Sequence, residues 1–272
     1  MVLQEQSQIP SFPPGQVAND CFPYAEILVD SITSNYECTE PVFFMTWGRR
    51  DGDQQNCPFY SPLCTYDGMN ARLRESYLQM TADNSATVGA CGAAWKQVEI
   101  ADTLMWRNLY SGDGSHPSAS GTYLNACVFY ATMLRKTPVG LSYYGSISQA
   151  DAQFLQQIAE DVVIDSSNTW SIGHADVVAD ADFQLTDSLS FAFVSNAINA
   201  TEHHWDFGDG STSLLSDPTH SYQSAGPYEV TYIASSACDA DTLYFTVNTA
   251  TGPNGIATHE TTTVSVIVET RV

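Results

Sequence analysis

The sequence predicts two domains, an α/β domain built on a parallel sheet and an all-β antiparallel sandwich. Strand-like and helix-like segments alternate from residue 1 to about residue 165, which is typical of a parallel sheet with helices on its faces. From about residue 178, short alternating segments are separated by Gly, Asp, Asn and Ser, which is typical of a sandwich. We expect the α/β domain over 1–165, a linker over 166–177, the sandwich over 178–249 and a linker or tail over 250–272.

Apolar periodicity predicts the elements of the first domain. Helical spacing of apolar residues predicts helices over 23–35, 66–80, 117–134 and 149–163. Continuous apolar runs predict strands over 41–47 and 86–90, and 104–110 is expected to run toward a further strand. The chain is expected to begin inside a strand, so we expect a sheet that is incomplete at its N-terminal side and a chain that is a fragment or a shortened gene product.

The charge of the chain restricts its partners. The chain contains nine Lys and Arg residues and 31 Asp and Glu residues, which gives a formal net charge of -22. This charge repels phosphate backbones and anionic membrane surfaces, so we expect no nucleic-acid partner. No apolar run is long enough to span a bilayer, and no signal peptide is visible at the N-terminus.

The chain has seven cysteines, an odd number, and two of them are spaced as in a local disulfide of an oxidising compartment. Cys57 and Cys64 enclose the loop CPFYSPLC, and this short separation suits a local disulfide. Cys91 and Cys127 lie within apolar patterns and are expected to be buried thiols. Zinc ligation is the weaker interpretation, because no CxxC or HxxxH spacing accompanies these residues.

The segment 109–118 reads LYSGDGSHPS and is the most specific motif of the first domain. Two residues separate a carboxylate from an imidazole, so Asp113 can accept the Nδ1 hydrogen of His116 and leave Nε2 to deprotonate a hydroxyl. In the alternative interpretation both residues cap the helix that begins near Pro117.

This D-x-x-H-P motif resembles the final conserved block of SGNH (GDSL-like) hydrolases, which are flavodoxin-like α/β proteins. The segments LQEQS at 3–7 and VFFMTWGR at 42–49 also resemble a bacterial SGNH subgroup. The resemblance covers about residues 1–140, and it implies that His116 is a general base and Asp113 its partner. By position, Gln4 and Gln6 replace the block that supplies an oxyanion donor, although solvated loop residues are an equal alternative.

The nucleophile block of the SGNH family is absent from the sequence. A Gly-Asp-Ser block would precede every segment matched above, and the chain contains none. Ser115 and Ser211 do not fit the place of the nucleophile, whereas Ser7 is conceivable. We expect the chain to be inactive or nearly so, because a base without a nucleophile loses most covalent catalysis.

Three segments of the second domain follow one another in the order of a PKD domain. They read EHHWDFGDGST at 202–212, DPTHSY at 217–222 and GPYEVTY at 226–232. Their order resembles an immunoglobulin-like PKD sandwich, with Trp205 and Phe207 facing inward and a tight glycine turn after them. The resemblance implies that this domain serves as a spacer, an adhesion module or a glycan binder.

No metal or cofactor is expected. His203 and His204 are adjacent on a strand and point to opposite faces, so with His220 they are expected to be ordinary strand residues. Asp206 and Asp209 could hold calcium, but turn formation explains them equally well.

The resemblances together imply a secreted ester hydrolase that acts on acyl or acetyl esters, including those of carbohydrates. Its partners are an ester or glycan substrate, and polysaccharide or cell-surface contact is expected through the PKD domain. The alternative is a non-catalytic extracellular protein that serves binding or adhesion. A flavodoxin-like domain that binds a small molecule is a third interpretation, but it lacks a phosphate loop.

Overall fold

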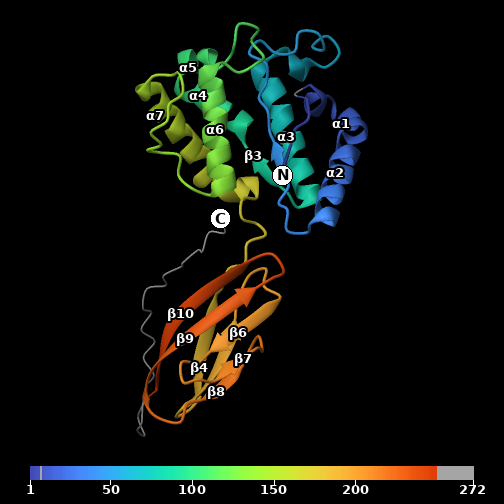
Figure 1. The fold of residues 1–272 in the computed structure, drawn as a ribbon. Coiled ribbons are helices and arrows are strands. Elements are labelled where there is room, and N and C mark those ends of the chain that lie inside the picture. The colour runs from blue at the N-terminus through green and yellow to red at the C-terminus, as the bar shows by residue number, and fades with distance from the viewer. Residues whose placement is uncertain (7, 250–272) are drawn as a thin grey trace. The chain divides into compact units, whose positions relative to one another are not determined.

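The computed structural model describes residues 1–6 and 8–249, and the chain divides into two compact units, residues 1–174 and 175–272 (Figure 1). Ser7 and the predicted tail over 250–272 lie outside the described residues. None of the described helices is long and apolar enough to cross a membrane.

The first unit is a three-stranded parallel sheet between two layers of helices. The strands β1 (Val2–Leu3), β2 (Val42–Phe44) and β3 (Thr87–Gly89) pair in parallel in the order β1-β2-β3. The helices are α1 (Pro14–Asp20), α2 (Phe22–Asn35), α3 (Tyr66–Asn84), α4 (Cys91–Ala101), α5 (Thr103–Asn108), α6 (Ala119–Leu134) and α7 (Gln149–Ala159). In Figure 1, α1, α2 and α3 lie on one side of the strands and α4, α6 and α7 on the other. The parallel α/β prediction is therefore confirmed.

Each side of the sheet has its own apolar core. Phe43, Met45 and Val88 pack with buried side chains of α2 and α3. The opposite core contains Trp95 of α4 together with buried residues of α5, α6 and α7. Burial of such large apolar side chains stabilises both helix layers on the sheet. The predicted buried thiols Cys91 and Cys127 belong to this second core and are free cysteines.

The four predicted helices are present, but the interpretation of residues 104–110 was wrong. This segment does not lead into a strand, because α5 occupies Thr103–Asn108. The Asp102 side chain accepts hydrogen bonds from the backbone N–H groups of Leu104 and Met105 and so caps the helix. The predicted helix over 149–163 is α7, which continues as the π-helical segment η3 (Glu160–Ile164).

The second unit is a sandwich of two antiparallel sheets. One sheet has the order β10-β9-β6-β7 and the other the order β4-β5-β8. Their strands are β4 (Ala181–Asp187), β5 (Ser190–Ser195), β6 (Glu202–Asp206), β7 (Thr212–Ser213), β8 (Thr219–Ser221), β9 (Gly226–Ser235) and β10 (Ala240–Thr249). The antiparallel sandwich prediction is confirmed.

The core of the second unit is aromatic. Trp205 is fully buried, and its ring stacks on Tyr232 with a centroid distance of 4.0 Å. Phe207 is buried beside it, as the alternation of this segment predicted. Gly208 has φ +78°, and a Cβ there would lie 2.3 Å from the carbonyl oxygen of Glu229. The turn after β6 therefore requires glycine at this position.

Candidate active site

The loop between α5 and α6 carries the Asp113–His116 motif and is closed at its base. Ser118 N donates to Leu109 O at 2.7 Å, and Ser111 N donates to the carbonyl oxygen of His116 at 2.8 Å. Ser118 is also the N-cap of α6, where its Oγ accepts hydrogen bonds from the first turn. Two backbone hydrogen bonds therefore cross the base of the loop and restrain it.

Asp113 and His116 contact each other at the tip of this loop. His116 Nδ1 lies 2.5 Å from Asp113 Oδ2. The other oxygen, Oδ1, accepts hydrogen bonds of 2.9 Å from Ser111 Oγ and from the backbone N–H groups of Ser115 and His116. The hydrogen bond from His116, followed by those from the backbone, holds the pKa of the Asp113 carboxyl well below its usual range. Asp113 therefore stays an ionised acceptor for Nδ1–H.

The helix-cap interpretation does not describe this pair, because Ser118 caps α6. The His116 side chain is 79% exposed and that of Asp113 51% exposed. Within residues 1–6 and 8–249, His116 Nε2 makes no hydrogen bond to a protein group. The nitrogen that a general base would use thus faces an accessible space.

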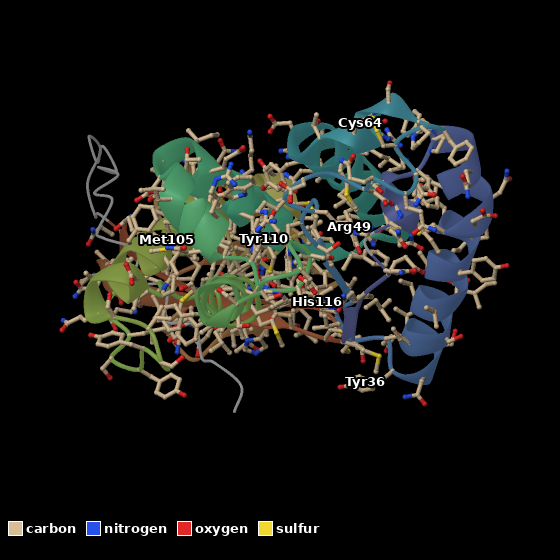
Figure 2. All side chains as sticks on the ribbon, turned by 90° about the horizontal axis from the view of Figure 1, so that it is seen from above. Tyr36, Arg49, Cys64, Met105, Tyr110 and His116 are labelled. Atoms are coloured by element: carbon tan, nitrogen blue, oxygen red, sulfur yellow. A yellow bond between two sulfur atoms is a disulfide. The ribbon has the colours of Figure 1, made fainter. Side chains whose placement is uncertain are left out.

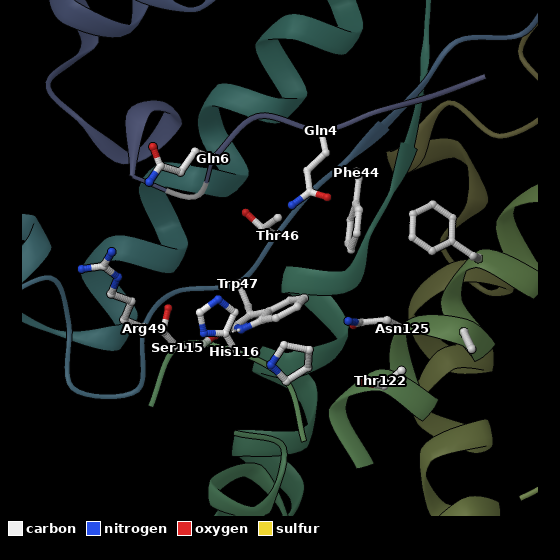
Figure 3. Close-up of a pocket in the computed structure, with 13 residues that line it drawn as sticks. Gln4, Gln6, Phe44, Thr46, Trp47, Arg49, Ser115, His116, Thr122 and Asn125 are labelled. Atoms are coloured by element: carbon white, nitrogen blue, oxygen red, sulfur yellow. Dashed lines mark hydrogen bonds between the residues drawn. The ribbon is translucent and has the colours of Figure 1, made fainter. Parts of the chain in front are cut away.

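A cleft of about 670 Å³ opens beside His116 (Figure 3). Its walls come from the segment after β1, from β2 and the segment after it, from the loop at His116 and from one face of α6. Its lining residues are Gln4, Gln6, Phe44, Thr46, Trp47, Arg49, Ser115, His116, Pro117, Thr122, Asn125, Ala126 and Phe129. The carboxyl ends of parallel strands meet at one edge of a sheet, which brings residues from β1 and β2 to the same cleft.

The structure brings both predicted glutamines to the cleft with His116. Gln6 Nε2 donates to Gln8 Oε1 at 3.1 Å, so its amide is engaged with its own segment. Figure 3 shows the Gln4 amide pointing into the cleft toward Thr46 and Phe44. Of the two, Gln4 has the better orientation for hydrogen bonding to a bound group.

Trp47 supports the loop that carries His116. Its Nε1 donates to the carbonyl oxygen of Ser115 at 3.0 Å. Its ring stacks on the buried Trp95 with a centroid distance of 4.0 Å and an interplanar angle of 3°. Trp95 Nε1 in turn donates to Asn125 Oδ1 at 2.8 Å, which links this stack to α6. The two tryptophans therefore hold one wall of the cleft in place.

The loop after Trp47 is joined directly to the loop at His116. Tyr110 Oη donates to the carbonyl oxygen of Gly48 at 2.7 Å, and Arg50 N donates to the carbonyl oxygen of Gly114 at 2.9 Å. Figure 2 shows Tyr110, Arg49 and His116 near one another in the first unit. Two hydrogen bonds thus hold these two loops together.

Arg49 lines the cleft and is held by a buried carboxylate. Its Nη1 lies 3.0 Å from Asp53 Oδ1, and the Asp53 side chain is fully buried. Asp53 Oδ2 accepts hydrogen bonds from Asn56 Nδ2 at 2.7 Å and Gln8 Nε2 at 3.1 Å. Burial raises the pKa of this carboxyl, but the hydrogen bonds from Asn56 and Gln8 and the charge of Arg49 outweigh that effect and lower it. Asp53 is therefore an ionised anchor behind the cleft.

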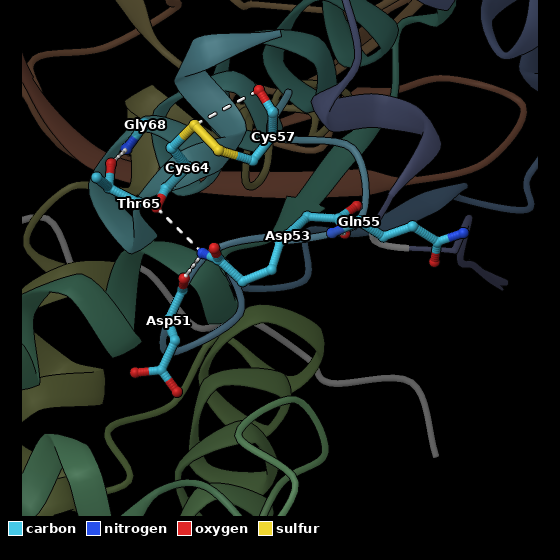
Figure 4. Close-up of a disulfide and its surroundings, with 8 residues drawn as sticks. Asp51, Asp53, Gln55, Cys57, Cys64, Thr65 and Gly68 are labelled. Carbon is cyan, nitrogen blue, oxygen red and sulfur yellow. Dashed lines mark hydrogen bonds between the residues drawn. A yellow bond between two sulfur atoms is a disulfide. The ribbon is translucent and has the colours of Figure 1, made fainter. Parts of the chain in front are cut away.

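The predicted disulfide between Cys57 and Cys64 is present and lies beside Asp53 (Figure 4). The loop that it closes is tied back to Asp53, because Asp53 N donates to Leu63 O at 2.7 Å and Cys57 N donates to Asp53 O at 2.8 Å. The disulfide thus restrains the segment that supports Arg49.

Replacing both Cys57 and Cys64 by serine should lower the free energy of unfolding by about 2 kcal/mol, since the disulfide closes a short loop and restricts the unfolded chain. Urea unfolding followed by tryptophan fluorescence would measure this change. The single variant Cys64→Ser, which also removes this bond, should produce the same decrease. An unchanged midpoint in both experiments would contradict the role given to this disulfide.

The histidines and aspartates of the second unit that were considered as metal ligands do not form a metal site. Within the described residues, no three His, Cys, Asp or Glu side chains come together in a way that could hold a metal ion. His203 Nδ1 lies 2.7 Å from Tyr232 Oη, and His220 Nε2 lies 2.8 Å from Asp209 Oδ2. Asp206 and Asp209 each accept a backbone N–H of the glycine turn, which is the turn role predicted as an alternative to calcium.

Comparison with known proteins identifies the second unit. The family model for the PKD domain matches residues 174–262. The PKD1 domain of the Vibrio cholerae metalloprotease PrtV is 32% identical over 28% of this chain and 99% of that domain, with a TM-score of 0.27. No curated protein sequence matches the chain.

Two further solved structures cover larger parts of the chain. A proposed SGNH hydrolase from Slackia heliotrinireducens is 28% identical, with 48% of this chain and 64% of that one covered and a TM-score of 0.36. A DUF4886 family protein from Bacteroides uniformis is 14% identical, with 60% and 61% covered and a TM-score of 0.48. The chain thus spans less than two thirds of either protein. The chain belongs to the PKD-domain family through residues 174–262, and it is similar in structure to SGNH hydrolase-like proteins.

Proposed function

We propose that the first unit carries the His and Asp members of an SGNH-type ester hydrolase site, with His116 as general base and Asp113 as its partner. The observation that carries this proposal is the 2.5 Å contact between His116 Nδ1 and Asp113 Oδ2 beside the cleft. An ionised carboxylate at this distance keeps the proton on Nδ1, so Nε2 can take a proton from an attacking hydroxyl.

Gln4 is the proposed oxyanion donor, with Gln6 as the alternative. Attack on an ester carbonyl places negative charge on its oxygen, and an amide N–H aimed at that oxygen stabilises the charge. The Gln4 amide enters the cleft, whereas the Gln6 amide donates to Gln8. Gln4 therefore accounts for this role better than Gln6 does.

The reaction of this chain differs from that of a complete Ser-His-Asp site. The 272 residues contain no Gly-Asp-Ser block. In this chain Nε2 takes a proton from water, and the resulting hydroxide adds to the carbonyl carbon of the ester. Collapse of this adduct expels the alkoxide, which takes the proton back from Nε2 and leaves as the alcohol, with the carboxylic acid as the other product. Such a site serves activated esters best, because their leaving groups need no proton in the rate-limiting step.

The substrate and location belong to the same proposal. We place the protein outside the cell, since the Cys57–Cys64 disulfide suits an oxidising compartment. For a complete Ser-His-Asp site, the proposed substrate is an acyl or acetyl ester, including esters of carbohydrates. The PKD domain is the proposed polysaccharide or cell-surface contact.

The second candidate function is non-catalytic binding at an extracellular surface. The 79% exposure of His116 favours it, because a strong general base is normally enclosed and shielded from water. Absence of any ester hydrolysis together with retention of the chain on a polysaccharide column would establish this second function and exclude the first.

The Asp113→Asn variant tests the proposed pair. An asparagine amide cannot replace the charge of the carboxylate, so His116 loses the partner that orients it and favours its reactive tautomer. Hydrolysis of p-nitrophenyl acetate should fall roughly fivefold to tenfold, a smaller loss than in an enclosed triad because this pair is exposed. The Asp51→Asn variant, which changes an exposed aspartate outside the cleft lining, should hydrolyse the ester at the parent rate. Equal rates in all three proteins would exclude a role for Asp113.

A further inference from the structure

A second hollow adjoins the cleft at His116. Its volume is about 490 Å³, and it is lined by Ala119, Thr122, Tyr123 and Ala126 of α6 and by Tyr143, Tyr144, Gly145 and Ser146 of the loop before α7. Thr122 and Ala126 also line the cleft that contains His116. The two hollows are therefore adjacent across one exposed stripe of α6, and we call the second one the tyrosine groove.

The loop that carries the groove tyrosines is held by a buried glutamine. Gln156 of α7 is fully buried, and its Oε1 accepts a hydrogen bond from Gly140 N at 3.1 Å. Its Nε2 donates to Leu141 O at 2.9 Å and to Tyr123 Oη at 2.7 Å. Tyr123 Oη then donates to the carbonyl oxygen of Tyr143 at 3.0 Å. This chain of hydrogen bonds fixes the loop against both α6 and α7.

The fixed loop leaves Tyr143 open to solvent. Its side chain is 81% exposed, and Tyr144 beside it is partly exposed. An exposed aromatic ring on a restrained loop loses little conformational entropy when it binds a ligand. The groove lining, all of which lies in the described part of the chain, includes no charged side chain. The groove is thus suited to an uncharged ligand with an apolar face and many hydroxyl groups.

We propose that the tyrosine groove binds a neutral polysaccharide chain and directs its ester groups to His116. Sugar rings present C–H faces that stack on aromatic rings, while their hydroxyls can bond to Thr122 and Ser146. The net charge of -22 opposes an anionic polymer. Continuity with the His116 cleft favours a polysaccharide over a proline-rich peptide, another ligand that aromatic grooves bind, because acylated polysaccharides carry ester groups along their length and peptides do not. The role in directing esters rests on the proposed function, whereas binding does not.

Affinity electrophoresis of the full chain in native gels with acetylated glucomannan, a neutral polysaccharide ester, tests the groove. The parent chain should be retarded, and Tyr143→Ala should weaken the association about tenfold, because one ring loses its buried contact. Tyr143→Phe keeps the ring and should be retarded as strongly as the parent. Tyr36→Ala removes a tyrosine that is 58% exposed and lines neither hollow, so it should behave as the parent.

The outcomes separate this proposal from the proposed function. His116→Ala should be retarded as the parent is, since the groove lining does not include His116. Retardation that depends on Tyr143 in a chain without hydrolysis supports the groove and contradicts the esterase. Equal retardation of the parent and Tyr143→Ala, or no retardation of the parent, overturns the groove as a polysaccharide site. Binding of a proline-rich peptide that depends on Tyr143 and competes with the glucomannan overturns it as well.

Discussion

The His116→Ala variant is expected to hydrolyse p-nitrophenyl acetate about a hundredfold more slowly than the parent chain, because it loses the group that takes the proton from the attacking water. Stopped assays of p-nitrophenolate release would measure this loss. His116 is 79% exposed, so its removal should leave the thermal unfolding temperature unchanged. The loss of hydrolysis can then be assigned to chemistry and not to unfolding.

Other imidazoles of the chain provide the control. Exposed histidines react slowly with activated esters, so a small background rate is expected from any of them. His204 is an exposed histidine on β6 of the second unit, and His204→Ala should keep nearly the full parent rate. If His116→Ala and His204→Ala lose the same small fraction, the measured hydrolysis is background and His116 has no special role.

The Asp53→Ala variant should show the largest loss of stability, with a decrease of about 3 to 5 kcal/mol in the free energy of unfolding of the first unit. Asp53 is fully buried, and its removal leaves Arg49 without its partner and two amide donors without acceptors. Urea unfolding followed by circular dichroism would measure the change. Asp51 pairs with Arg50 at the surface, so Asp51→Ala should cost less than about 1 kcal/mol.

The contribution of Asp53 should depend on pH with a defined sign. Its pKa in the folded protein lies below the value of an ordinary aspartate. Its stabilisation is therefore fully present above the unfolded pKa, about 4, and is lost as the pH falls through the lower folded value. The difference in stability between the parent and Asp53→Asn should shrink below about pH 4. A difference that stays constant to pH 2 would contradict the lowered pKa of Asp53 in the folded protein.

The local patterns of the sequence were sufficient for several elements of both units. Apolar spacing predicted α2, α3, α6 and α7, and a short cysteine separation predicted the disulfide. In the second unit, the glycine turn after Trp205 predicted the positive φ of Gly208. These features depend on residues that are close in sequence, so short sequence patterns are enough to predict them.

The parts that could not be predicted depend on contacts between distant segments. The segment 104–110 is apolar enough for a strand, but Asp102 caps it as helix α5. Trp47 belongs to an apolar run, and only its contact with Ser115, 68 positions away, shows that it supports the loop at His116. The sequence does single out Asn125 as a residue with a structural role, because a polar residue inside an apolar helical stripe needs a buried hydrogen-bond partner. That partner is Trp95. The roles of His116, Asp113, Gln4 and Gln6 stay predictions until the variants are measured.

The buried position of Gln156 has a consequence for how binding could change during evolution or selection. Its amide holds together two helices and the loop with Tyr143, yet it lies beneath the surface and out of reach of a ligand. A leucine there would fill the space but leave Gly140, Leu141 and Tyr123 without their partner. Screens for altered polysaccharide preference should therefore recover substitutions at 156, although no sugar touches that residue.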